Sequence, residues 1–75
     1  MKGPMKPQEL RDARHELGMS VNELAEALRL NPKNGGRKVR RWETGEHEIS
    51  GPVAVAIEAM LNGFMPYHMF QGYEE

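Results

Sequence analysis

The stretch of sequence that decides the fold is Gly36-Arg37-Lys38-Val39-Arg40-Arg41-Trp42-Glu43-Thr44-Gly45. With 3.6 residues per helical turn, Val39 and Trp42 fall on one face of a helix, which we expect to be buried. The opposite face carries four cations, two at its centre and two on its flanks: Arg37 and Arg41, then Lys38 and Arg40. Gly45 is a typical helix end. A short helix with one apolar and one cationic face indicates a surface for a polyanion such as DNA.

The length and composition of the chain restrict the possible classes of protein. Seventy-five residues make one domain with a thin core and leave no room for a separate catalytic domain. There are no cysteines, and the three histidines lack the close paired spacing of a zinc site, so we expect no metal and no cofactor. Paired carboxylates or a Ser/His arrangement at usable spacing are also missing from the sequence. We therefore expect a binding protein and not an enzyme.

The distribution of charge is uneven although the net charge is only -1. All ten Lys and Arg residues lie in residues 1–45, whereas residues 46–75 carry acids and neither of these cations. This asymmetry indicates a basic surface for a polyanion and a second region that faces solvent or another protein. No apolar stretch approaches the roughly 20 residues that cross a bilayer, and no signal-peptide pattern opens the chain, so we expect a cytoplasmic protein.

Two helices are expected before residue 30. Pro7 at the first helical position and Glu9 in the first turn predict a helix from residue 7 to about residue 17, which Gly18 ends. Ser20-Val21-Asn22-Glu23 has the pattern of a capping box and predicts the start of the next helix. Apolar residues at helical spacing are expected to face the core: Leu10, Ala13 and Leu17 in the first helix, and Val21, Leu24, Ala25 and Leu28 in the second.

The next segments are a connector, the cationic helix and a fourth helix. Residues 31–36 contain Pro32 and two glycines, so we expect them to form the connector. A fourth helix is expected from Ser50-Gly51-Pro52 to Asn62-Gly63. Four of its apolar residues recur at core spacing: Val53, Ile57, Met60 and Leu61. Residues 64–75 show no clear periodicity.

Two charged residues fall on faces that should be buried. Arg14 lies within the apolar stripe of the first helix, and Glu43 lies beside Val39 and Trp42. An unpaired buried charge costs several kcal/mol, about 3–5 when a buried pair is broken. We therefore expect these two helices to pack together and Arg14 to form a bidentate ion pair with Glu43.

Several segments together resemble the Cro/cI-type helix-turn-helix family: Glu9-Leu10-Arg11, Leu17-Gly18-Met19-Ser20, Glu23-Leu24-Ala25 and Val39-Arg40-Arg41-Trp42-Glu43-Thr44-Gly45. The resemblance covers roughly residues 6–63. It implies an all-α, lambda-repressor-like bundle of four to five helices that contains a helix-turn-helix. It also implies a homodimeric transcriptional regulator, such as a repressor, that reads an inverted-repeat operator in double-stranded DNA and regulates its own operon.

The same resemblance implies where such a protein occurs and how its chain is divided into segments. Such small proteins occur as phage repressors, as antitoxins and as anti-CRISPR-associated regulators, in the cytoplasm of a bacterial or phage-infected cell. Residues 1–5 would form an N-terminal arm, residues 6–63 the DNA-binding domain and residues 64–75 a C-terminal tail. The turn before the third helix is about four residues longer than is usual in the family, with Lys33-Asn34-Gly35-Gly36 as the insertion. This insertion either extends the third helix at its N-terminus or forms a loop that contacts DNA.

The expected DNA contacts fall into two groups. Three residues are expected to read base edges in the major groove: Arg37, Lys38 and Arg41. Guanine is the preferred partner, because its O6 and N7 accept a forked guanidinium. Four residues are expected to hold phosphates: Ser20, Lys33, Asn34 and Arg40. A cationic helix face is also often only a solvated surface, and the resemblance favours DNA binding over that alternative.

The C-terminal third is apolar and acidic, which leaves two interpretations open. We expect a homodimer interface there, formed by Met60, Phe64, Met65, Tyr67 and Phe70. The alternative is an antitoxin-like interaction module, in which this region binds a partner protein. The core is expected to contain Leu10, Leu17, Leu24, Leu28, Val39, Trp42 and Ile57.

Overall fold

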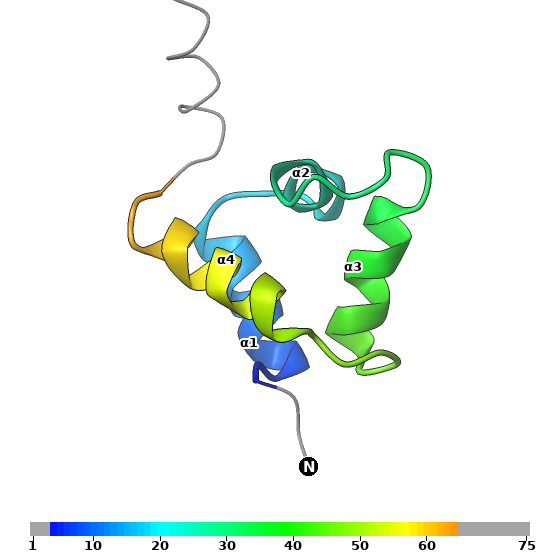
Figure 1. Cartoon of the computed structure of the whole chain (residues 1–75), viewed down its shortest axis with the longest axis horizontal. Helices are drawn as coiled ribbons and strands as arrows, with labels where there is room; N and C mark the ends of the chain where they lie inside the picture. Colours follow the sequence, from blue (N-terminus) through cyan, green and yellow to red (C-terminus); the bar gives the residue numbers. More distant parts are fainter. Residues whose placement is uncertain (1–3, 65–75) are drawn as a thin grey trace, which may run out of the picture.

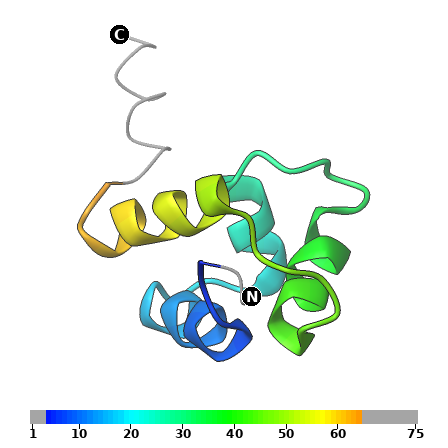
Figure 2. The same ribbon diagram turned by 60° about the horizontal axis from the view of Figure 1, so that its bottom comes forward.

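The computed structural model describes residues 4–64 of the chain. Within this range it contains four helices and no strand. They are α1 (Pro7–Glu16), α2 (Val21–Ala27), α3 (Gly35–Thr44) and α4 (Gly51–Leu61). Figure 1 shows α2 and α3 on one side of the bundle and α4 lying across α1, and Figure 2 shows the same arrangement from a second direction. The expected all-α bundle is confirmed.

The ends of the helices follow the sequence signals. Pro7 is the first residue of α1, and the Lys6 amide donates to the Glu9 carboxylate at 2.8 Å. At the start of α2, the Glu23 amide donates to Ser20 Oγ at 3.1 Å, and the Ser20 amide donates to the Glu23 carboxylate at 2.8 Å. This reciprocal pair is the capping box, and it satisfies two amides that a helix start leaves without partners.

The core lies between all four helices. Its buried apolar residues are Leu10, Ala13, Leu24, Ala25, Ala27, Val39, Trp42, Ile49, Ile57 and Met60. Leu17 and Leu28, which we expected in the core, are only partly buried and pack against its edge. Ile49 is 2% exposed although it lies in the loop before α4, where no helical periodicity could indicate its burial.

The expectation for the end of α4 is wrong in one residue. Leu61 is 38% exposed, whereas Met60 is 3% exposed and belongs to the core. The cause is the composition of α4, whose apolar residues extend around the whole helix. Spacing alone therefore does not determine which of its residues face inward.

The connector into α3 is shorter than we expected, because α3 already begins at Gly35. The Gly35 amide donates to the Asn31 carbonyl at 2.6 Å, and a Cβ added to Gly35 would lie 2.9 Å from the Ala25 Cβ. Only a glycine fits this close approach of α3 to α2. Gly35 and Gly36 are therefore not part of the connector, and of the two alternatives for the insertion, an extension of the third helix at its N-terminus is the one that the structure contains.

Two further expectations concern membrane-spanning helices and the C-terminal residues. No helix within residues 4–64 is long and apolar enough to cross a membrane. The expected contacts of Met65, Tyr67 and Phe70 fall outside the described residues.

Candidate nucleic-acid interface

The orientation of α3 is fixed on its inner face by a buried ion pair. Arg14 Nε donates to Glu43 Oε2 at 2.6 Å, and Arg14 Nη2 donates to Glu43 Oε1 at 3.2 Å. Arg14 Nη1 also donates to the Met19 carbonyl at 3.1 Å. The side chains are 13% and 8% exposed, so neither charge has ready access to water. The structure thus contains the bidentate pair that the sequence led us to expect, and the pair ties α1 to α3.

Arg11 is a second arginine at Glu43, and the sequence analysis missed it. Its Nη2 donates to the Glu43 main-chain carbonyl at 3.1 Å, and its Nε lies 3.9 Å from Glu43 Oε1. The available signal was its spacing, because residues three apart on a helix are neighbours and Arg11 precedes Arg14 by three. Two guanidinium groups therefore hold the last turn of α3.

The outer face of α3 carries the four cations, and all of them are exposed: Arg37, Lys38, Arg40 and Arg41. Considering residues 4–64 only, the side chains of the first three make no hydrogen bond or ion pair. Arg41 Nε lies 4.0 Å from Glu46 Oε2, and both side chains are largely solvated. Exposed pairs of this kind contribute about 0–1 kcal/mol to stability, so an incoming anion can compete for Arg41.

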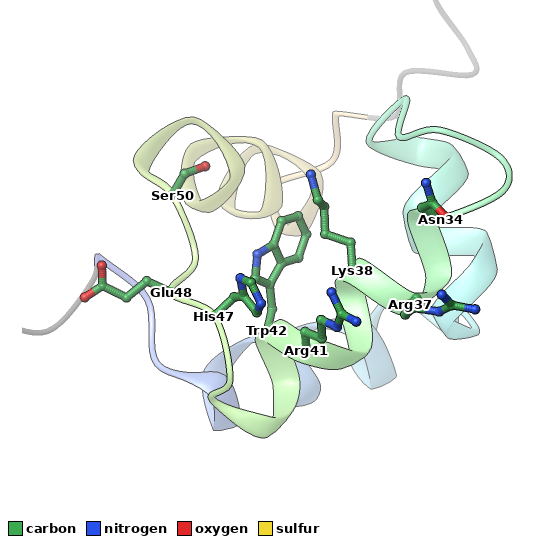
Figure 3. Close-up of a pocket in the computed structure, with 8 residues that line it drawn as sticks. All are labelled: Asn34, Arg37, Lys38, Arg41, Trp42, His47, Glu48 and Ser50. Carbon is green, nitrogen blue, oxygen red and sulfur yellow. The ribbon is translucent and has the colours of Figure 1, made fainter.

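Beside this face lies an open hollow of about 620 Å³. Figure 3 shows the side chains that line it, which come from the residue before α3, from α3 itself and from the loop after it: Asn34, Arg37, Lys38, Arg41, Trp42, His47, Glu48 and Ser50. Three of them are cations that project from one helix. No cluster of three potential metal ligands occurs among the described residues. The hollow is thus a wide, solvated and cationic surface.

The structure separates the expected base-reading residues from Arg40. Arg37, Lys38 and Arg41 all line the hollow, and Arg40 does not. Arg40 lies on the opposite flank of α3, on the side of the helix nearer to Glu43. A cation on the flank of an inserted helix faces the rim of a groove, where the phosphates are.

The other expected phosphate contacts differ among themselves. Lys33 and Asn34 are exposed in the turn before α3, and the Asn34 side chain lines the hollow (Figure 3). Ser20 is exposed as well, and its hydroxyl oxygen accepts in the capping box while its amide donates to the Glu23 carboxylate. The hydroxyl hydrogen is not used in that box and can donate to a phosphate. The expected phosphate contact of Ser20 therefore stays a prediction.

The loop after α3 borders the hollow with residues that the sequence analysis did not select. His47, Glu48 and Ser50 line the hollow, and Glu46 approaches Arg41. Gly45 adopts a left-handed conformation with φ of 85°, so the chain turns back beside the helix. The signal that could have indicated these residues was Gly45 itself, since a glycine at a helix end reverses the chain direction.

One described residue of the expected dimer interface, Met60, is not at the surface. Its side chain is in the core of the bundle, which corrects the expectation. Phe64 is 45% exposed. Two other large apolar residues of α4 are exposed: Leu61, which we expected in the core, and Val55, about which the sequence led to no prediction.

Comparisons of the chain with protein-family models, with curated proteins and with solved structures find no match. The resemblance to Cro/cI-type regulators thus depends on the sequence segments that carry it.

Proposed function

We propose that this chain is a sequence-specific regulator of transcription, of the Cro/cI type, that binds double-stranded DNA with α3 in the major groove. The observation that carries the proposal is the outer face of α3, on which four exposed cations project from a helix whose inner face is buried and ion-paired. Lysine and arginine on an exposed helix supply the charge that phosphates attract. The fixed inner face supplies the constant orientation that base reading requires.

The shape of α3 favours double-stranded DNA over RNA as the ligand. The major groove of B-form DNA is about 12 Å wide and admits an α-helix, whereas that of an RNA duplex is too narrow for side chains to read. The bundle offers one exposed cationic helix within residues 4–64 and not an aromatic sheet surface, on which single-stranded bases would stack.

Each cation has a role that follows from its place. Arg37 and Arg41 lie at the centre of the outer face and are the residues that reach base edges, with guanine as the preferred partner. Lys38 lies in the hollow beside them and contacts a base as well. Arg40, Lys33 and Asn34 contact phosphates and set the register of the helix in the groove.

The assembly that we propose is a homodimer on an inverted repeat, where it acts as a repressor. One short helix reads only a few base pairs, and a two-fold dimer doubles the site, with half-sites about 10 base pairs or a multiple of it apart. The exposed apolar residues of α4 support this assembly. Figures 1 and 2 show the C-terminal end of α4 on the opposite side of the bundle from α3, so a second copy bound there leaves α3 free.

The same end of α4 supports a second candidate function, an antitoxin-like module that binds a partner protein. Leu61 and Phe64 are exposed there, and no lysine or arginine follows residue 45. The two candidates differ in a size measurement. The homodimer predicts twice the mass of one chain at micromolar concentration without any other protein, whereas the module predicts a monomer that awaits its partner.

The proposal is tested by selection from a random duplex library with the full chain, followed by fluorescence anisotropy on the enriched and a scrambled duplex. We expect an enriched inverted repeat that contains guanine. Arg41→Ala should lose about 1–3 kcal/mol of preference for the enriched duplex. Arg40→Ala, which removes the same charge from the same helix, should weaken both duplexes equally. Equal and weak binding of both duplexes by the parent protein, falling steeply with salt, would contradict the proposal.

A further inference from the structure

The end of α3 holds Glu46 in a fixed place beside Arg41. The Arg41 carbonyl accepts hydrogen bonds from the Glu46 amide at 2.9 Å, from the His47 amide at 3.2 Å and from the Thr44 hydroxyl at 3.1 Å. Gly45, with its left-handed φ, is what turns the chain back to allow these bonds. The backbone of Glu46 is thus attached to the very residue whose side chain lies at the centre of the outer face.

The side chains of Glu46 and Arg41 then approach each other on the solvent side. Glu46 Oε2 lies 4.0 Å from Arg41 Nε, and the two side chains are 62% and 46% exposed. A solvated pair of this kind contributes little to stability. A carboxylate on a surface that binds phosphates also lowers affinity for every DNA sequence. Glu46 thus adds little to stability and opposes general DNA affinity, so neither of these explains its place beside Arg41.

We infer that Glu46 is a specificity-determining residue that positions Arg41 for guanine. The inference rests on the proposed function. The carboxylate oxygen lies 4.0 Å from Nε, which is too far for a hydrogen bond, so it attracts the guanidinium without fixing it. That position leaves the two terminal nitrogens, Nη1 and Nη2, free to donate together to guanine O6 and N7. An arginine that is drawn toward one place samples fewer positions in the unbound protein, so it loses less rotational freedom when it binds.

The negative charge of Glu46 also acts against the wrong contacts. A free arginine on a groove-binding helix can fold back to a phosphate, which gives affinity without sequence preference. Glu46 repels phosphates at this place and competes with them for Arg41. Discrimination between sequences is a difference of affinities, so a group that weakens all non-specific contacts raises it.

Glu48 provides a matched control for Glu46. It lies in the same loop, is exposed, and carries the same charge. Its side chain lines the hollow but points away from Arg41 in Figure 3, and no ion pair involves it within the described part of the chain. Glu46→Gln and Glu48→Gln therefore remove equal charge, but only the first removes a group that faces Arg41.

The experiment repeats the random-duplex selection with the parent, Glu46→Gln and Glu48→Gln proteins. Binding is then measured to three duplexes: the one that the parent enriches, a version in which the guanine of each half-site is replaced by another base, and a scrambled one. Both variants should bind the scrambled duplex more tightly than the parent, Glu46→Gln by the larger factor, because it also frees Arg41 for phosphates. Glu46→Gln should lose about fivefold or more of the preference for one guanine in each half-site, and Glu48→Gln should keep it. Thermal unfolding of all three proteins should coincide.

Three results would contradict the inference. Glu46→Gln with the parent's guanine preference overturns it and leaves the proposed function intact. An equal loss in Glu48→Gln also overturns it, because the effect would then come from charge and not from contact with Arg41. A parent protein that enriches no sequence contradicts the proposed function, and the inference fails with it.

Discussion

The two faces of α3 use the same kinds of side chain for different purposes. On the inner face, Glu43 is 8% exposed and is held by Arg14 and Arg11. At the outer face, Arg41 lies close to Glu46 of the following loop, and both side chains remain solvated. A buried pair fixes where a helix lies, because breaking it leaves a charge without water. A solvated pair leaves its members available to a ligand. The comparison teaches that burial, more than residue type, separates structural charges from binding charges in this chain.

Removal of the inner carboxylate should have the largest effect. Glu43→Ala leaves the buried Arg14 guanidinium without its partner, so we expect a loss of about 3–5 kcal/mol in the free energy of unfolding, measured by urea denaturation. The double replacement Arg14→Met with Glu43→Leu should recover much of that loss, because it removes both charges and keeps the volume. A loss below about 1 kcal/mol in Glu43→Ala would show that the inner face does not depend on the pair.

The next effect concerns the contact between α3 and α2. Gly35→Ala places a methyl group 2.9 Å from the Ala25 Cβ and 3.0 Å from the Leu30 Cβ, neither of which can rotate away. We expect a loss of about 1–3 kcal/mol in thermal or urea unfolding.

Gly36→Ala is the control for this contact. Its added methyl group meets the end of the exposed Asn22 side chain, which can move. The effect should be clearly smaller than that of Gly35→Ala. The reverse order would contradict the packing of α3 on α2.

A smaller loss of stability is expected at the C-terminal end of α3, where Gly45 turns the chain. Gly45→Ala must adopt a φ of 85°, which costs an alanine about 1–2 kcal/mol. The added methyl group meets only an ordinary contact with Pro7, 3.7 Å away, so the cost comes from the backbone. Gly51→Ala, whose added Cβ has no neighbour within 4 Å, serves as the control in the same unfolding measurement. Equal stabilities of the two variants would contradict the left-handed turn.

The smallest effect on stability should come from the outer face. Arg40→Ala removes an exposed charge, so the free energy of unfolding should change by no more than about 0.5 kcal/mol. Its effect should appear in DNA binding, where the slope of log affinity against log salt concentration falls by about 0.9 for one lost phosphate contact. An unchanged slope would remove Arg40 from the phosphate contacts.

The sequence predicted those features that depend on neighbouring residues or on a strict energetic demand. Ser20 and Glu23 are three residues apart, so their capping box could be recognised directly. The pairing of Arg14 with Glu43 crosses the chain, yet it could be predicted because two charges on buried faces need partners. The inward position of Val39 and Trp42 followed from their spacing.

The remaining features depend on tertiary packing, which no local pattern specifies. The helical state of Gly35 depends on the nearness of Ala25 and Leu30, which overrides the preference of glycine for turns. The burial of Ile49 depends on where its loop crosses the core. In α4, apolar residues on every side made Met60 and Leu61 equivalent by pattern, and only the contact with the other helices distinguishes them.

The most direct test of DNA binding by the outer face of α3 is a titration of the full chain with its enriched duplex, followed by nuclear magnetic resonance of the backbone amides and the arginine Nε–H groups. We expect the largest shifts at residues 33–41 and at Glu46, and none at Arg14, whose Nε–H stays bonded to Glu43. Shifts confined to the exposed residues of α4, with Arg37 and Arg41 unchanged, would contradict the proposed role of α3.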